Sequence, residues 1–285
     1  MIAFVGSVFS PYYAWDGRRD PENHVCINVC LYGPRKPYPT DWWAMTERGR
    51  GALDRGAAHF AVGPSAVRWE GGTLTVDFDE RAVPLPLRLR GRLRLHPHAV
   101  NEREHGIADG HRWRPVVPSG DIEVDVPSLG LCWRGHGYHD TNHGREGLEH
   151  AFRRWNWSRV SRPGGGAAIL YDVEPRGEAP HTIALRFERD GRASTFDPPP
   201  RQPLRRGLWR VAREVQCDPG HAPGIERMME DAPFYTRAAI RSRLMGEEVV
   251  GVHETFDGDR FGSRWVKGLL PFRMPRRAPR SARAR

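Results

Sequence analysis

The chain has 285 residues and a mass of 32.4 kDa, enough for one large domain or two of ordinary size. Hydrophobic residues make up 39% and charged residues 28%, and the 31 Gly and 25 Pro give a polar, turn-rich composition that excludes collagen-like and fully disordered classes. The net charge is +9, and apolar stretches such as 167–170 are far shorter than the roughly 18 residues of a membrane-spanning helix.

The first residues and the cysteines bear on the compartment. Residues 1–6 lack the basic start and the apolar core of about 7–15 residues that a secretory signal needs, so we expect a cytoplasmic protein. The cysteines show neither the spacing of a zinc site nor the density of a disulfide scaffold, and we expect buried or idle thiols at Cys26, Cys30, Cys132 and Cys217.

Alternation with a period of two recurs in short segments and predicts half-buried antiparallel strands at 66–70, 74–78, 87–95, 122–126 and 183–187. Gly71-Gly72 lies between two of them and predicts a hairpin turn, and Asp190-Gly191 predicts another, because glycine supplies the positive φ that such turns require. Helical windows are few and fall at 224–231 and 232–245. The fold class is therefore mainly β, of a sandwich or barrel type with a few short helices.

Two breaks in composition divide the chain. The segment 161–166 is rich in glycine and precedes a new strand at 167–171, so we place a domain boundary there. The predicted domains are 1–160 and 161–272. The basic tail that follows, 273–285, is expected to be disordered. A long hairpin turn inside one continuous structure is the alternative reading of 161–166. The proline-rich stretch 197–203 predicts a loop.

The positive charge is almost entirely arginine, since Lys36 and Lys267 are the only lysines. Nucleic acid and an anionic membrane surface are the two polyanions that such charge attracts. No helix-turn-helix, zinc-finger or RNA-binding pattern accompanies the arginines, so we expect no nucleic-acid partner. A membrane surface and a plain solvated surface both stay open on this evidence.

Polar and aromatic residues gather most densely between residues 96 and 150, where His111 and Trp113 form one group and Tyr138 and Asp140 another. On strands, residues two apart share a face, so each pair would point in one direction. If both faces line one cavity, an acid, a base and two aromatic rings converge. A carboxylic acid in an apolar pocket has a raised pKa and can protonate an uncharged, electron-rich substrate.

Other readings of these residues remain open. A tyrosine and an aspartate at a strand end often anchor a turn, and a histidine near a tryptophan is often a packing contact. His139 and His143 are four residues apart and would form a metal site on a helix, but Gly137 and Gly144 beside them disfavour a helix, and we expect no metal. Nucleotide-binding motifs are absent from the sequence, and we expect no nucleotide-dependent chemistry.

Five long segments resemble the carotenoid 1,2-hydratases, also called hydroxyneurosporene synthases, of purple photosynthetic bacteria. They begin with Gly-Ser-Val-Phe-Ser-Pro-Tyr-Tyr at 6–13 and end with Trp-Val-Lys-Gly-Leu-Leu-Pro-Phe-Arg-Met-Pro at 265–275, and the others are 28–35, 43–48 and 137–144. The resemblance covers nearly the whole chain.

The resemblance implies two tandem lipocalin-like β domains and a hydro-lyase without a cofactor. The reaction it implies adds water to the terminal C1–C2 double bond of acyclic carotenoids such as neurosporene and lycopene, giving 1-hydroxy carotenoids in pathways of the spheroidene and spirilloxanthin type. The family's active-site positions fall on Asp140, His111, Trp113 and Tyr138 of this sequence. In the mechanism we expect, Asp140 protonates C2, the aromatic rings stabilise the cation at C1, and His111 positions or deprotonates the attacking water.

The substrate gives the arginines a function, since a long polyene lies in the bilayer. The partners we expect are thus an acyclic carotenoid, water and an anionic membrane surface, and the expected location is the cytoplasmic side of the photosynthetic inner membrane, attached peripherally. Trp265 and the segment 269–272 could insert, or could pack as an ordinary helix or strand. Two rival functions remain, a lipocalin-like carotenoid carrier and an isoprenoid cyclase, in which water is excluded from the same cation.

Overall fold

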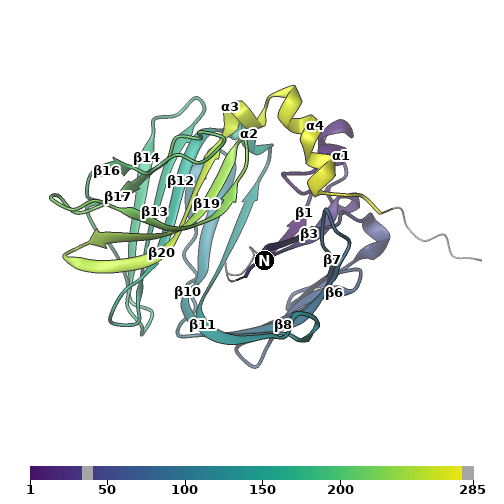
Figure 1. Ribbon diagram of the computed structural model, residues 1–285, viewed down its shortest axis with the longest axis horizontal. Helices are drawn as coiled ribbons and strands as arrows, with labels where there is room; N and C mark the ends of the chain where they lie inside the picture. Colours follow the sequence, from purple (N-terminus) through teal and green to yellow (C-terminus); the bar gives the residue numbers. More distant parts are fainter. Residues whose placement is uncertain (34–40, 278–285) are drawn as a thin grey trace, which may run out of the picture. The chain divides into compact units, whose positions relative to one another are not determined.

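The computed structural model describes residues 1–33 and 41–277, which form two compact units (Figure 1). Of the described residues, unit 1 comprises 1–33, 41–96, 122–135 and 267–277, and unit 2 comprises 97–121 and 136–266. The strands are antiparallel and the helices short, so the predicted mainly β class is confirmed. Within the described ranges, no helix is long and apolar enough to cross a membrane.

Unit 1 contains two antiparallel sheets. The first has the strand order β1-β2-β3, and the second runs from β4 through β5, β6, β7 and β8 to β10 and β11. The element bounds are β1 Ile2–Val5, α1 Pro11–Trp15, η1 Pro21–Asn23, β2 Val25–Tyr32, β3 Asp41–Met45, η2 Arg50–Ala52, β4 Leu53–Gly56, β5 His59–Val62, β6 Ser65–Glu70, β7 Thr73–Arg81, β8 Arg88–Pro97 and η3 Pro127–Leu129.

Strands predicted from the period of two are confirmed in unit 1. In β7, Leu74, Val76 and Phe78 are buried while the residues between them are partly exposed, so the apolar face points into the core. Glu70 pairs with Thr73 across the predicted turn, and Gly71 and Gly72 both have positive φ. A two-residue hairpin loop with this conformation matches the twist of its strands.

Unit 2 is built on a sheet with the strand order β15-β14-β13-β12-β20-β19-β18. Two small helices, α2 and α3, pack against each other and against β12 (Figure 1). The bounds are β9 His105–Ala108, α2 Leu148–Ala151, β12 Phe152–Ser161, β13 Ala167–Pro175, β14 His181–Phe187, β15 Ala193–Thr195, β16 Arg201–Pro203, β17 Glu214–Gln216, β18 Gly224–Asp231, β19 Tyr235–Leu244, β20 Glu247–Asp257 and α3 Gly258–Phe261.

Three elements have several residues in each unit, namely β10 (His111–Val126), β11 (Leu131–Gly144) and α4 (Arg264–Arg273), and β8 reaches unit 2 with its last residue, Pro97. The units therefore differ from the predicted domains 1–160 and 161–272. Ser161 pairs with Ala167 as the last pair of the β12–β13 ladder, so the glycine-rich segment is a hairpin turn inside unit 2, the alternative reading of that segment.

The helices predicted at 224–231 and 232–245 are wrong, because these residues form the β18–β19 hairpin. Buried residues alternate strictly along β19 from Thr236 to Leu244, a period of two that the run of helix-favouring residues obscured. The predicted loop 197–203 is also corrected at its end, since Arg201–Pro203 forms the short strand β16 and pairs with β17.

The basic tail was predicted to be disordered from residue 273, and its first residues are ordered instead. Arg273 ends α4, and Met274 is buried in a cluster with Cys26 and Met45. Glu47 is fully buried and forms an ion pair with Arg276, which also donates to the carbonyl of Asn23. Residues 278–285 of the predicted tail, like residues 34–35 of the segment 28–35, lie outside the described residues.

Candidate active site

The four candidate residues lie in unit 2 on two neighbouring strands, His111 and Trp113 on β10 and Tyr138 and Asp140 on β11. His111 and Trp113 are buried while Arg112 between them is exposed, so the first pair shares the inner face of its strand. Asp140 and Tyr138 follow the same spacing on β11.

Trp113 and Asp140 are joined by a hydrogen bond. The indole Nε1–H of Trp113 donates to Oδ2 of Asp140 at 2.9 Å, and Trp113 itself has no exposed surface. Burial raises the pKa of Asp140 to about 6, although the Trp113 donor favours the carboxylate, and the negative charge of Glu254 adds to the increase. About one tenth of Asp140 is thus protonated at pH 7, far more than for an ordinary aspartate.

Tyr138 lies beside this pair. Its hydroxyl oxygen is buried and makes no hydrogen bond of good geometry within the described residues. Burial and the nearby charge of Asp140 raise the pKa of Tyr138. The phenol therefore stays neutral, and its hydroxyl group lies next to the acid. Its ring contacts Trp157 with 5.3 Å between centroids.

His111 occupies the end of the same face, and the structure places no contact between its ring and Asp140. The imidazole lies edge-on to Phe152, with centroids 5.0 Å apart, and its Nε2 is buried and unpartnered among the described residues. Burial lowers the pKa of His111, so the ring is neutral at pH 7 and can accept a proton.

Gly144 allows His111 to take this position. A Cβ built on Gly144 would lie 2.1 Å from Nδ1 and Cε1 of the His111 ring, which is far below any contact distance. Only glycine permits this approach. The last glycine of the 137–144 segment thus acts on the candidate base, a role that its place in the sequence did not suggest.

Aromatic side chains from the main sheet of unit 2 complete the surroundings. Tyr171 on β13 meets Trp113 edge to face at 5.4 Å, and Trp155 on β12 packs on Tyr171 at 5.8 Å and stacks on Phe256 at 5.6 Å. Trp155 and Trp157 both lie on β12 and were not among the predicted site residues. Their alternation with Asn156 on one strand was the signal that both face the same side.

The histidines considered as metal ligands do not come together. His139 points away from Asp140 on β11, where burial lowers its pKa to about 4, and the closest acidic group to His143 is Glu104 at 3.7 Å. In the described part of the chain, no group of three His, Cys, Asp or Glu side chains is close enough to hold a metal ion. Cys26, Cys30, Cys132 and Cys217 form no disulfide within the described residues.

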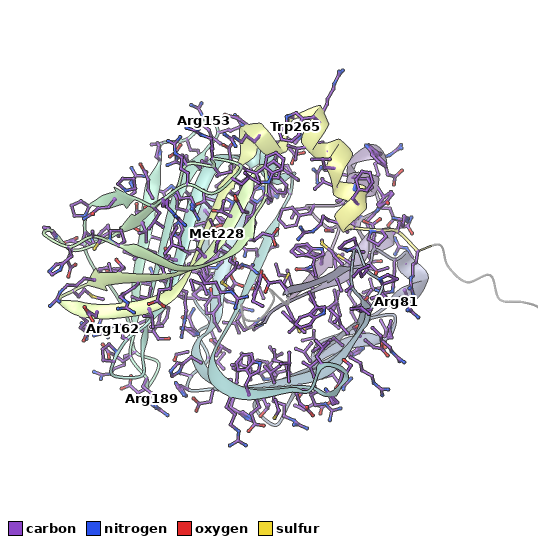
Figure 2. All side chains as sticks on the ribbon, in the orientation of Figure 1. Arg81, Arg153, Arg162, Arg189, Met228 and Trp265 are labelled. Atoms are coloured by element: carbon purple, nitrogen blue, oxygen red, sulfur yellow. The ribbon has the colours of Figure 1, made fainter. Side chains whose placement is uncertain are left out.

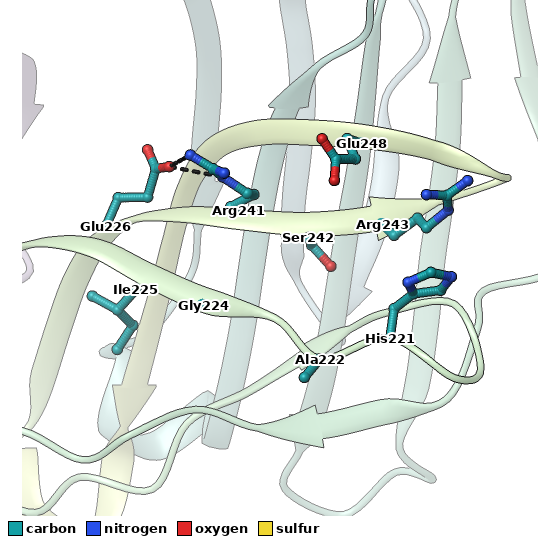
Figure 3. A pocket seen from close by; sticks show the side chains of 9 residues that line it. All are labelled: His221, Ala222, Gly224, Ile225, Glu226, Arg241, Ser242, Arg243 and Glu248. Carbon is teal, nitrogen blue, oxygen red and sulfur yellow. Dashed lines mark hydrogen bonds and ion pairs between the residues drawn. The ribbon is translucent and has the colours of Figure 1, made fainter.

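A separate pocket of about 290 Å³ opens beside β18 and β19, and none of the four candidate residues lines it (Figure 3). Glu226 and Arg241 form an ion pair at its edge, and Arg243, Glu248 and His221 add further polar groups. A charged lining of this kind does not suit a hydrocarbon substrate.

Comparison with known proteins gives the family. The sequence profile described as "Carotenoid hydratase CrtC" matches residues 1–283. This chain belongs to the carotenoid hydratase family. The acyclic carotenoid 1,2-hydratase of Rhodobacter capsulatus is 43% identical over 98% of both chains, and that of Cereibacter sphaeroides is 41% identical over 97% of this chain and 98% of the other. The hydratase of Thiocapsa roseopersicina is 46% identical and aligns with 97% of this chain and 68% of its own length.

Solved structures share the fold of this carotenoid hydratase family member. A putative AttH from Nitrosomonas europaea aligns with a TM-score of 0.57 over 82% of this chain and 80% of its own, at 12% identity. Kievitone hydratase from Nectria haematococca aligns with a TM-score of 0.50 over 82% and 84%, at 9% identity. At such identities the likeness concerns the fold, and it confirms the predicted lipocalin-like architecture.

Proposed function

We propose that this protein is an acyclic carotenoid 1,2-hydratase that adds water across the terminal C1–C2 double bond of substrates such as neurosporene and lycopene. Relatives with this name, at 41–46% identity over nearly the whole chain, support the substrate class. The observation that carries the reaction is Asp140, an acid with a pKa of about 6 among aromatic rings.

The first step is protonation of the alkene. The Asp140 carboxylic acid gives its proton to C2, and the positive charge appears at C1, the more substituted carbon. Burial in an apolar, aromatic site keeps enough Asp140 protonated for this step. The Trp113 N–H then holds the resulting carboxylate in place, because a hydrogen bond to a charged acceptor is stronger than one to a neutral acceptor.

The second step stabilises the tertiary cation. The faces of aromatic rings carry negative potential, and a desolvated cation over such a face is stabilised by about 2 kcal/mol. Trp113 and Tyr138 lie nearest to the acid, and Tyr171 supports Trp113 from behind. This contribution lowers part of the barrier and also protects the cation from other bases.

The third step is capture by water. The neutral His111 ring positions the water through its unpartnered Nε2 and accepts the proton as the C1–O bond forms. The product carries a hydroxyl group at C1 and a new hydrogen at C2. The proton on His111 returns to Asp140 through solvent, so the cycle consumes one alkene and one water and transfers no electrons. We therefore propose that the reaction requires no cofactor.

The test is turnover of lycopene by purified protein in detergent, without cofactor, in heavy-oxygen water. We expect a product heavier by one labelled water, with the label at C1. Asp140→Asn should lower the rate by about 10²–10⁴-fold, the range for a general acid, while the near-ultraviolet circular dichroism stays that of the folded protein.

Two other outcomes would replace the proposal. Unchanged lycopene that copurifies with the protein would indicate a carrier, and an isomer without label would indicate a cyclase that excludes water from the cation. Full activity of Asp140→Asn would contradict the role of Asp140 even if labelled product forms.

A further inference from the structure

Unit 2 presents one exposed loop with both apolar and basic side chains, the segment Arg205-Arg206-Gly207-Leu208-Trp209-Arg210. Leu208 is 85% exposed and Trp209 is 39% exposed. The ring of Trp209 stacks on Trp265, which is itself 53% exposed, with 5.9 Å between centroids. Figure 2 shows Trp265 at one end of unit 2 and Arg189 at the other. Large apolar side chains exposed together mark a contact surface.

The loop has a fixed conformation, which a surface held for binding requires. The Asp231 carboxylate accepts a hydrogen bond from the backbone N–H of Leu208, and Arg260 donates to the carbonyl of Trp209 at 2.6 Å. A Cβ on Gly207 would lie 2.2 Å from Oδ2 of Asp231, so the loop passes as closely as a glycine allows. These contacts hold Leu208 outward although its burial would lower the free energy of the protein.

Arginines surround the exposed apolar residues. Arg206 and Arg210 flank Leu208 and Trp209 in the sequence of the loop. Arg205 precedes Arg206 in the loop, and Arg264 precedes Trp265 in α4. All four are exposed, and none forms an ion pair with any residue of the described ranges. Elsewhere in unit 2 many arginines are paired, as Arg241 is with Glu226. The cluster therefore carries a net positive charge, which the Asp231 carboxylate beside the loop offsets only in part.

We propose that Leu208, Trp209 and Trp265, with Arg205, Arg206, Arg210 and Arg264, form the surface by which this protein docks on an anionic lipid bilayer. The apolar side chains enter the boundary between headgroups and acyl chains, where tryptophan is favoured, and the arginines contact the anionic headgroups. This inference supports the proposed function, since an acyclic carotenoid dissolves in the bilayer. Lipid binding, however, can be measured without any substrate.

The experiment is cosedimentation of the full chain with vesicles of phosphatidylcholine alone or with added phosphatidylglycerol. We expect binding to increase with the anionic lipid and to fall in high salt. Arg206→Glu should weaken binding to the anionic vesicles by about fivefold or more, the contribution of one basic residue at a membrane surface. Leu208→Ser should weaken binding to both vesicle types, and its exposure makes it neutral for folding.

Matched controls are Arg189→Glu and Val250→Ser, which alter an exposed arginine and an exposed apolar residue elsewhere in unit 2. Both should bind like the wild type. The docking surface would be contradicted if Arg189→Glu weakened vesicle binding as much as Arg206→Glu, or Val250→Ser as much as Leu208→Ser. Equal binding of the wild type to both vesicle types would contradict it as well. Dimerisation that Leu208→Ser abolishes, without vesicle binding, would assign the patch to a second copy of the chain instead.

Turnover separates this inference from the proposed function. Leu208→Ser should keep wild-type turnover of lycopene in detergent micelles and lose it when lycopene is supplied in anionic vesicles. Vesicle binding without any turnover by the wild type would contradict the proposed function alone. Normal turnover from vesicles by Leu208→Ser would contradict the docking surface alone.

Discussion

The indole N–H of Trp113 donates to Oδ2 of Asp140 at 2.9 Å, and the side-chain amide of Asn142 lies 3.5 Å from the same oxygen. One donor from a rigid, fully buried ring fixes the orientation of the acid without abolishing its raised pKa. Burial has the larger effect, and the pKa of about 6 is the net result. The same contact can thus serve the acid before proton transfer and the carboxylate after it.

The pH dependence of turnover follows from these groups. The reaction needs protonated Asp140 and neutral His111, whose pKa burial lowers. We expect kcat/KM to fall above about pH 6 with a slope of one proton, and to fall on the acidic side only below the ordinary pKa range of histidine. Rates in detergent between pH 4 and 9 test this. A flat profile across pH 5–8 would contradict the assignment of the acid.

Trp113→Phe removes the N–H donor and keeps an aromatic ring. Because that donor favours the carboxylate, its loss should raise the pKa of Asp140 further and shift the alkaline limb of the pH profile upward by roughly one unit. The maximal rate should fall, since the acid is less well oriented. A downward shift of the limb would show that Trp113 does not act on Asp140 in solution.

Gly144→Ala tests the placement of His111. The new methyl group would occupy the position of the imidazole, so the ring must move, and displacement of a reacting group by about 1 Å can lower the rate about 100-fold. Gly164→Ala is the matched control, because a Cβ there meets no atom within 4 Å. Similar rates for the two variants would mean that the position of His111 does not limit turnover.

The stability of Asp140→Asn should depend on pH in one direction. The raised pKa means that the native state binds the Asp140 proton more tightly than the unfolded chain does, so the wild type loses stability as the pH rises from about 4 through 6. The variant lacks this loss, and its unfolding free energy should exceed that of the wild type by up to about 3 kcal/mol above pH 7 and converge with it at pH 4. Urea denaturation at several pH values measures the difference, with Asp197→Asn on an exposed loop as control.

Arg276→Ala should destabilise unit 1. Glu47 is fully buried, with His24 at 2.9 Å and Arg276 as its partners, and loss of one partner of a buried ion pair costs about 3–5 kcal/mol. Arg277→Ala, at an exposed side chain next in sequence, should have a small effect. Thermal unfolding compares them. If Glu47→Gln restores the stability of Arg276→Ala, the loss arises from the uncompensated charge; if it does not, the cost comes from packing.

Sequence patterns predicted the strands of this protein much better than its connections. Alternation in the sequence identified β6, β7 and β14, and in β7 the structure shows the alternating buried face directly. The same signal was present in β19, but Ala, Leu and Arg favour helices, and packing in the sheet overrode that preference. The boundary near residue 161 could not be recognised as a turn, since glycine runs serve linkers and hairpins alike.

The candidate site was likewise predicted in part, because some of its residues have a local sequence signal and others do not. Spacing within β10 and β11 and the family resemblance brought forward Trp113, Tyr138 and Asp140, which the structure places together. Tyr171 comes from β13, and its approach to Trp113 depends on long-range sheet packing that has no local signature. The contact between Gly144 and His111 is likewise visible only in three dimensions.

The pairing of Glu47 with Arg276 has a consequence for synthesis. During translation the strands around residue 47 leave the ribosome more than 200 residues before Arg276 does. Until then the Glu47 carboxylate has no arginine, and Cys26 and Met45 lack the Met274 side chain that covers them. Unit 1 therefore reaches its native core only as a late step after release of the C-terminal segment, when unit 2 can already be folded. A premature stop codon near residue 270 would consequently damage the beginning of the protein rather than its end.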